Sequence, residues 1–241
     1  LNLSSFNTSN VTSFFQMFLA CGSLKNLDIT HFNTANVRSM RWMFGRCSGL
    51  QHIDLSHFDT RNVQDMGEMF YNDYGLTSLD LSNFNTENLT NMWCMFKGCS
   101  GLTTLDISNF NTDKVTHMQE LFQNCTSLQH INMSSFKTAK VEVFRDMFDN
   151  CTSMASIQAG SAAIPDSIYA QVNNPNLLVY VNEAALAPSG VQNVVVNGQA
   201  REIVLTDATT GNNNFYVPQT FTAERISYTR NFAQSTQVGV S

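Results

Sequence analysis

The chain has 241 residues, of which 43% are apolar and only 13% are charged, so it can build a sizeable folded core. Its formal net charge of −6 argues against nucleic-acid binding and against adhesion to anionic membranes, because both need a basic surface. No run of about 18 apolar residues occurs, so no segment is predicted to insert into a membrane.

Residues 1–156 are six copies of one 26-residue unit. Three positions mark the period without interruption: Phe6, Phe32, Phe58, Phe84, Phe110 and Phe136; Thr8, Thr34, Thr60, Thr86, Thr112 and Thr138; and Phe18, Phe44, Phe70, Phe96, Phe122 and Phe148. A fixed period of this length predicts a solenoid, in which each unit buries its apolar face against its neighbours.

The fourth unit shows the pattern that every unit follows. Leu79 and Leu81 alternate with polar residues, which predicts a short half-buried strand. The later apolar residues have three-to-four spacing, which is typical of one face of a helix: Leu89, Met92, Met95, Phe96 and Cys99. Thr86 or Asn88 is expected to cap the start of this helix. We therefore predict an α/β solenoid with a parallel sheet on one face and helices on the other.

Five of the six cysteines occupy one position of the unit: Cys21, Cys47, Cys99, Cys125 and Cys151. The third unit has Asp73 there. We expect a structural ladder of buried free thiols, although disulfides between neighbouring units remain an alternative. A metal site is disfavoured because the cysteines are single, without paired cysteines or partner histidines. Cys94 occupies a mostly polar position, so we expect it near the surface.

The outward face of the sheet is the candidate binding surface. It presents four carboxylates at one position of the unit and polar side chains at its neighbour: Asp28, Asp54, Asp80 and Asp106, with His52, Thr104 and His130. Carboxylates about 4.8 Å apart repel one another, which should raise some of their pKa values. This strip predicts binding of a polar or basic partner, or of bridging divalent cations. The alternative is that each aspartate accepts hydrogen bonds from a neighbouring hydroxyl, such as Ser82, and only prevents aggregation.

No arrangement typical of an enzyme is present in the sequence. The five histidines are scattered over different unit positions, apart from His52 and His130, and no phosphate-binding loop or zinc-protease motif occurs. We therefore expect a non-enzymatic protein without a cofactor. Trp42 and Trp93 are expected to pack or decorate the helical side, and not to form a platform for sugars.

The repeat ends near residue 157. Residues 157–181 read as a degenerate capping unit, which closes a solenoid spanning 1–181. Residues 182–241 predict a small β-rich module with few strands: runs at 191–196 and 201–205 flank Asn197-Gly198, a strong hairpin signal. At the other end the first unit begins at once as a strand, so we expect preceding residues or other contacts to cover it.

The stretch LDLSNFNTENLTNMWCMF, with its equivalent LDISNFNTDKVTHM, resembles the leucine-rich repeats of BspA-like bacterial surface proteins over residues 1 to about 157. The resemblance implies a leucine-rich-repeat solenoid on a secreted or surface-anchored bacterial protein, as in gut commensals. It implies adhesion or protein–protein interaction with a host or microbial protein or a glycan. The expected form is a monomer. The alternatives are a structural spacer that displays another module, and a cation-dependent adhesin that uses the aspartate strip.

Overall fold

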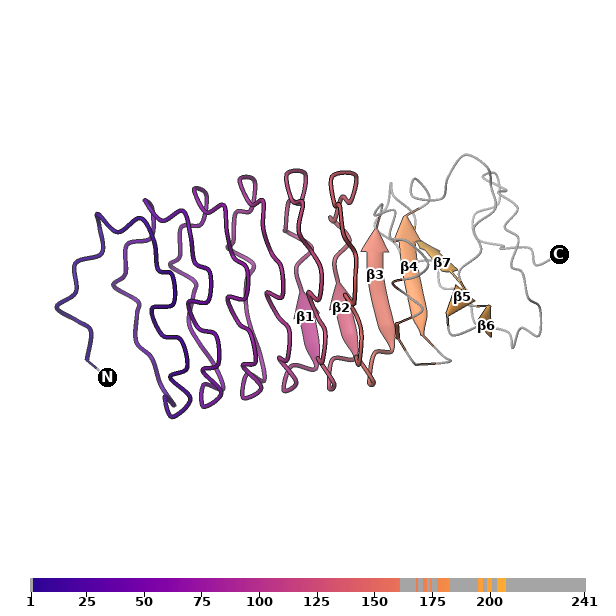
Figure 1. Cartoon of the computed structure of the whole chain (residues 1–241), viewed down its shortest axis with the longest axis horizontal. Coiled ribbons are helices and arrows are strands. Elements are labelled where there is room, and N and C mark those ends of the chain that lie inside the picture. The colour runs from indigo at the N-terminus through magenta and orange to yellow at the C-terminus, as the bar shows by residue number, and fades with distance from the viewer. Residues whose placement is uncertain are drawn as a thin grey trace.

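The structure is a computed structural model that describes residues 2–160 without a gap, and then 168, 171–172, 174, 177–182, 195–196, 199–200 and 203–206. Figure 1 shows successive units side by side along the longest axis, with the N-terminus at one end of the row. Backbone hydrogen bonds between neighbouring units join residues 25 to 27 positions apart in sequence.

A parallel sheet runs along one side of the units, as predicted. Five strands form it in the order β1-β2-β3-β4-β7, namely Thr104–Asp106, His130–Asn132, Ser156–Gly160, Leu178–Asn182 and Ile203–Thr206. From β1 to β3 the register follows the repeat, since Thr104 pairs with His130 and His130 pairs with Ser156. The equivalent segments of earlier units, 26–28, 52–54 and 78–80, are not strands.

The helices predicted for the other side do not form, and that prediction is wrong. Residues 2–160 contain no helix, and no helix in the described part of the chain is long and apolar enough to cross a membrane. In their place each unit has what we call a ribbon segment, residues 13–20, 39–46, 65–72, 91–98, 117–124 and 143–150. Isolated parallel bridges join neighbouring ribbon segments, for example between Ser13 and Ser39.

Backbone hydrogen bonds in the ribbon alternate between two kinds of partner. The N–H of Phe14 donates to the carbonyl of Ser39 in the next unit at 2.9 Å, and the N–H of Phe18 donates to Met43 at 2.9 Å. Between them, Met17 N–H donates to the carbonyl of Phe14 within its own unit at 3.2 Å. The ribbon is therefore a series of tight turns whose remaining donors are satisfied by the neighbouring unit.

Left-handed backbone at two positions of every unit excludes a helix. The first position has φ between 53° and 60° and the second between 58° and 77°; they are Gln16, Trp42, Glu68, Cys94, Glu120 and Asp146, and Ala20, Arg46, Asn72, Gly98, Asn124 and Asn150. A right-handed helix cannot pass through a positive φ. Glycine and asparagine, which tolerate this region best, fill four of the six second positions.

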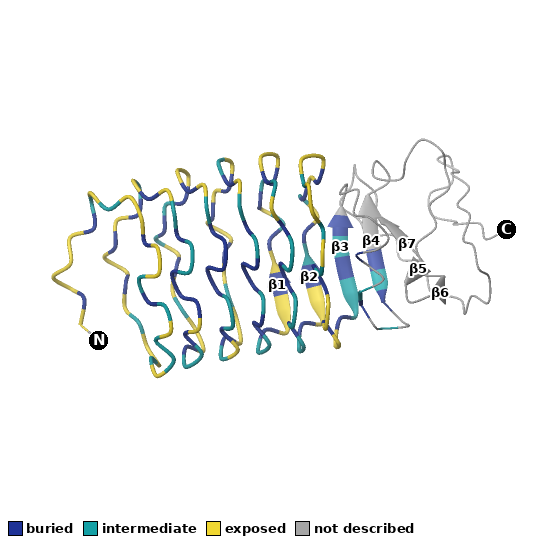
Figure 2. Ribbon diagram, viewed as in Figure 1, coloured by how far each residue is buried: buried dark blue, intermediate teal, exposed yellow. Residues whose placement is uncertain are grey.

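The apolar positions predicted for the core are nevertheless correct. Met40, Met43 and Phe44 are buried, as are the equivalent residues of the other units except the half-buried Met17 and Phe144, because tight turns also return a side chain inward every three or four residues. The blue segments of Figure 2 follow this interior from unit to unit. One phenylalanine per unit stacks on the next, with ring centroids 5.3–5.9 Å apart from Phe18 to Phe148. Burial of each such ring contributes about 2–3 kcal/mol.

Buried threonines replace the predicted helix caps. The Thr86 hydroxyl donates to the carbonyl of Asn111 at 3.0 Å and accepts the N–H of Asn111 at 2.7 Å. Thr60 does the same for Asn85 of its neighbouring unit. Asn88 donates through its amide to the carbonyl of Arg61, also one unit away. The predicted cap residues therefore join units to one another.

Beyond residue 182 the described strands match the prediction in part. β5 (Val195–Val196) and β6 (Gln199–Ala200) pair antiparallel on either side of Asn197-Gly198, as the hairpin signal predicted. β7 does not join this pair, although residues 201–205 were expected to. It pairs in parallel with β4, with Val179 opposite Ile203, and extends the main sheet.

Candidate functional site

The aspartate strip lies on the exposed face of the units, as expected from its alternation with buried residues. Asp28, Asp54, Asp80 and Asp106 are all exposed. The Oδ1 atom of each accepts the backbone N–H two residues later, at 2.9 Å in Asp80 and 3.1 Å in Asp28. Asn2 makes the same bond to Ser4 at 3.0 Å. These side chains therefore hold the turn that follows the strand position.

The pKa values of the strip differ from the expectation. Mutual repulsion was expected to raise them, but the pKa values of Asp28, Asp54 and Asp80 are lowered. Hydrogen bonds from the side chains and backbone of Thr30, Ser56 and Ser82 are the largest causes. Donors to the charged form outweigh repulsion that water screens.

The other predicted strip residues are exposed, and the two histidines bond to serines of the next units. The Nδ1 atoms of His52 and His130 lie 2.8 Å from the hydroxyls of Ser78 and Ser156 in the next units. Thr104 is exposed at the start of β1. Within the described residues, no three histidine, cysteine, aspartate or glutamate side chains gather closely enough to hold a metal ion.

Four of the ladder cysteines are buried. Cys47 Sγ donates to the carbonyl of Phe18 at 2.9 Å, and Cys99, Cys125 and Cys151 bond in the same way at 3.0 Å. Cys21, in the first unit, is half-buried, and all six cysteines are free. Burial raises the pKa of Cys47 and Cys125 to about 12, so these thiols stay protonated and serve as weak donors.

Asp73 replaces cysteine in this ladder and is 1% exposed. Its Oδ1 accepts the N–H of Cys47 at 2.6 Å. Burial nevertheless raises the pKa of Asp73 to about 8, because the bond from Cys47 offsets little of the desolvation of the carboxylate. Asp73 is therefore protonated near neutral pH, as the thiols are.

Cys94 is 2% exposed, and its expected surface position is wrong. That expectation depended on the polar residues at the equivalent positions, but Glu68 at one of them is buried too. The Cys94 backbone has φ 53°, and its Sγ lies 3.6 Å from Glu120 Oε2. Burial raises the pKa of Cys94 to about 12, so it is a poor nucleophile.

Three positions of the ribbon carry a different residue type in nearly every unit. They are Phe15, Arg41, Gly67, Trp93, Gln119 and Arg145; Gln16, Trp42, Glu68, Cys94, Glu120 and Asp146; and Leu19, Gly45, Tyr71, Lys97, Gln123 and Asp149. Gly45, Gly67, Glu68 and Cys94 are buried, and the other members are half-buried or exposed. Their backbones make the same inter-unit bonds. The framework therefore fixes the backbone here but leaves the side chain free.

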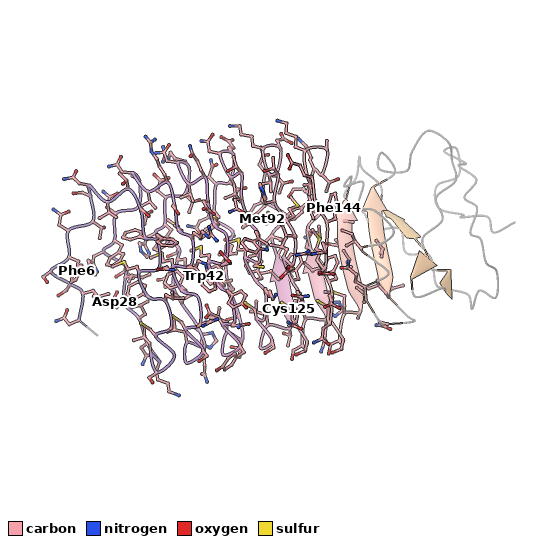
Figure 3. The ribbon with its side chains drawn as sticks, viewed as in Figure 1. Phe6, Asp28, Trp42, Met92, Cys125 and Phe144 are labelled. Atoms are coloured by element: carbon pink, nitrogen blue, oxygen red, sulfur yellow. The ribbon has the colours of Figure 1, made fainter. Side chains whose placement is uncertain are left out.

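Aromatic and cationic side chains of units two to four gather on this surface. We call Arg41, Trp42, Arg46, Tyr71, Trp93 and Lys97 the ribbon-face patch (Trp42 is labelled in Figure 3). The rings of Trp42 and Tyr71 lie 4.8 Å apart between centroids. Each of the three rings has a cation 5.8–5.9 Å from its centroid. Cations over aromatic faces attract the rings electrostatically.

Two cations of the patch form half-buried ion pairs. Arg41 Nε lies 2.8 Å from Glu68 Oε2, and Lys97 Nζ lies 2.6 Å from Glu120 Oε2. The hydrogen bonds and charge of Lys97, with help from Arg145, lower the pKa of Glu120. Trp42 fits its place because Gly45 has no side chain: a Cβ there would lie 2.5 Å from the indole.

The sequence did not lead to this patch, because the candidate binding surface was chosen from residues that recur at one position of the unit. The helix period placed Trp42 and Trp93 on one helical side but gave no reason to group them with Arg46 and Tyr71. A comparison of equivalent positions would have helped, since three variable columns stand out from a regular unit. The contact between rings and cations needs the ribbon backbone, which the spacing did not predict.

The comparisons with known proteins agree with the repeat. No curated protein and no solved structure is detectably similar to the chain. One family model, described as "Mycoplasma protein of unknown function, DUF285", matches twice, over residues 1–78 and 74–160. Together the two matches span most of the chain and all six units. The chain belongs to the DUF285 family.

Proposed function

We propose that the chain is a non-enzymatic protein that mediates protein–protein interaction or adhesion through a leucine-rich-repeat solenoid of the BspA-like kind. It acts at a bacterial cell surface or after secretion, on a host or microbial protein. One observation supports this proposal most: three ribbon positions carry unrelated side chains in otherwise nearly identical units, and most of these side chains reach the surface. A framework that keeps its backbone constant while its surface varies suits recognition.

The composition of the variable surface favours a partner protein. Trp, Tyr and Arg are the residues that most often dominate the energy of protein–protein contacts. The ribbon-face patch combines these three residue types within units two to four. The ion pair of Arg41 and the packing of Trp42 over Gly45 restrict these side chains. Pre-organised side chains lose little entropy on binding, which favours affinity.

Two other functions, a structural spacer and a cation-dependent adhesin, can be distinguished from this one by experiment. A structural spacer needs no variable surface, and a cation-dependent adhesin would use the aspartate strip. The strip carboxylates already accept bonds from their own chain, through Oδ1 in Asp28, Asp54, Asp80 and Asp106. Each has a second oxygen left for a cation, so a chelator control is needed.

The proposal is tested by measuring binding of the chain to a panel of immobilised extracellular matrix and bacterial surface proteins, with and without a chelator. We expect saturable binding to at least one protein, unchanged by the chelator. Binding that the chelator abolishes would favour the cation-dependent adhesin. Binding to nothing in either condition would favour the spacer and contradict the proposal.

A further inference from the structure

Arg46 differs from its counterparts at the second left-handed position of the ribbon. Four of the other five residues there are asparagine or glycine, whereas Arg46 is an exposed arginine with φ 62°. Left-handed backbone costs a residue other than glycine roughly 1–2 kcal/mol. The third unit avoids most of this cost with Asn72. The backbone N–H of Arg46 makes the same inter-unit bond as its counterparts, so the framework does not require an arginine side chain at this position.

Two aromatic rings lie near the guanidinium of Arg46. Its Cζ lies 5.9 Å from the ring centroid of Trp42 and 5.8 Å from that of Tyr71. The two rings lie against each other, with an angle of 55° between their planes. A guanidinium beside aromatic rings keeps N–H groups that can donate in pairs to a carboxylate.

Arg46 is the uncompensated charge of the patch. Arg41 is paired with Glu68 and Lys97 with Glu120. Within residues 2–160, no carboxylate lies within 4.0 Å of the Arg46 guanidinium. In a chain of net charge −6 this leaves a fixed positive group over an aromatic surface.

We propose that the ribbon-face patch docks an acidic polypeptide segment, with a carboxylate of that segment on Arg46. This inference rests on the proposed function and names the surface and the partner chemistry. An acidic polysaccharide fits less well. Sugars stack on open ring faces, whereas a cation covers Trp42, Tyr71 and Trp93 alike.

Tryptophan fluorescence reports on the patch directly, because the only two tryptophans of the chain, Trp42 and Trp93, lie in it. The whole chain is titrated with poly-L-glutamate in low salt, and with polygalacturonate as the acidic polysaccharide. We expect saturable fluorescence change with poly-L-glutamate, and at least tenfold weaker binding in Arg46→Glu. Arg46→Gln, which keeps the same backbone cost, should weaken binding about threefold to tenfold. Matched thermal unfolding of the variants shows that they fold.

Arg61→Glu is the matched control, since Arg61 is an arginine with a 70% exposed side chain that is paired with Asp59 outside the patch. It should weaken binding less than threefold. Equal losses in Arg46→Glu and Arg61→Glu, no fluorescence change, or equally tight binding of polygalacturonate would overturn the inference. If a panel protein binds the wild-type chain and Arg46→Glu equally well, this patch is refuted while the proposed function stands.

Discussion

The strand face, which carries the aspartate strip, and the ribbon face satisfy their backbone N–H groups in opposite ways. On the strand face the side chain is part of the turn: Asp80 accepts the N–H of Ser82, and the equivalent residues of other units do the same. On the ribbon face the backbone satisfies itself, through bonds such as that from Phe70 to the carbonyl of Met95. One face therefore repeats its side chains and the other varies them.

This difference distinguishes residues that each unit needs in order to form from residues that differ between units. A residue that recurs in every unit is needed for each unit to form, so recurrence of the aspartates by itself indicates a structural role. Departures from the repeat should be costly where they fall inside the framework and tolerated where they fall on the ribbon surface. The predictions below test that rule, in order of decreasing effect on stability.

The largest effect is expected at Asp73, a departure inside the core. Its pKa of about 8 in the folded chain lies above its ordinary value of 3.8, so folding favours the protonated form. The contribution of Asp73 to the free energy of unfolding should be fully present below pH 4 and fall as pH rises towards 8, by on the order of 5 kcal/mol. Asp73→Cys, which restores the ladder, should remove this fall; chemical denaturation at pH 4 to 9 measures it.

Asp80→Asn is the control for that series. The pKa of Asp80 is lowered in the folded chain, so its contribution to stability is present above its ordinary pKa and is lost only as pH falls below about 4. Between pH 5 and 8 this variant should follow the wild type. If Asp73→Cys also follows the wild type over that range, the buried carboxyl is not the source of the pH dependence.

The second effect distinguishes the ribbon from a helix. Gly98 has φ 77°, and a Cβ there would lie 2.0 Å from Asn72 Oδ1. Gly98→Ala should therefore lower the free energy of unfolding by about 2–3 kcal/mol, whereas in a helix the same change would raise it by about 1 kcal/mol. Asn124→Gly, at the equivalent position with φ 63°, should stay within about 0.5 kcal/mol. A stabilising Gly98→Ala would contradict the ribbon.

The features that the sequence predicted correctly are those that depend on the burial of apolar residues. The period of 26, the buried columns such as Met92 and Phe96, and the parallel sheet all come from apolar spacing, which any inward-returning backbone obeys. The ribbon was missed because three-to-four spacing fits both a helix and a series of tight turns. The available signal was local: Asn72, Gly98, Asn124 and Asn150 share one position, and these residue types favour left-handed backbone.

The candidate site was less predictable than the fold. The strip residues were placed correctly on the surface, but their hydrogen bonds to Ser56, Ser82 and Ser108 could only be offered as an alternative. The ribbon-face patch depends on which side chains the turns direct outward. The polarity of a unit position did not predict that direction, since Cys94 is buried at a mostly polar position.

The smallest effect on stability is expected on the strand face. Asp54, Asp80 and Asp106 changed together to Asn should alter the free energy of unfolding by less than about 1 kcal/mol, because an amide oxygen can accept the same N–H. Asn132 already does so, from Ser134 at 3.2 Å. The matching triple Ala variant should lose about 0.5–1.5 kcal/mol per site. Equal losses in the two variants would show that the side-chain oxygen is not needed.

The central claim is that recognition lies on the ribbon face and not on the strand face. It is tested most directly with a panel protein that binds the wild-type chain, by comparing the affinities of Arg46→Glu and the triple Asn variant at 0.15 M salt. We expect Arg46→Glu to weaken binding at least tenfold and the triple Asn variant to stay within twofold. A loss of binding in the triple Asn variant, with Arg46→Glu unaffected, would contradict the claim and place recognition on the aspartate strip.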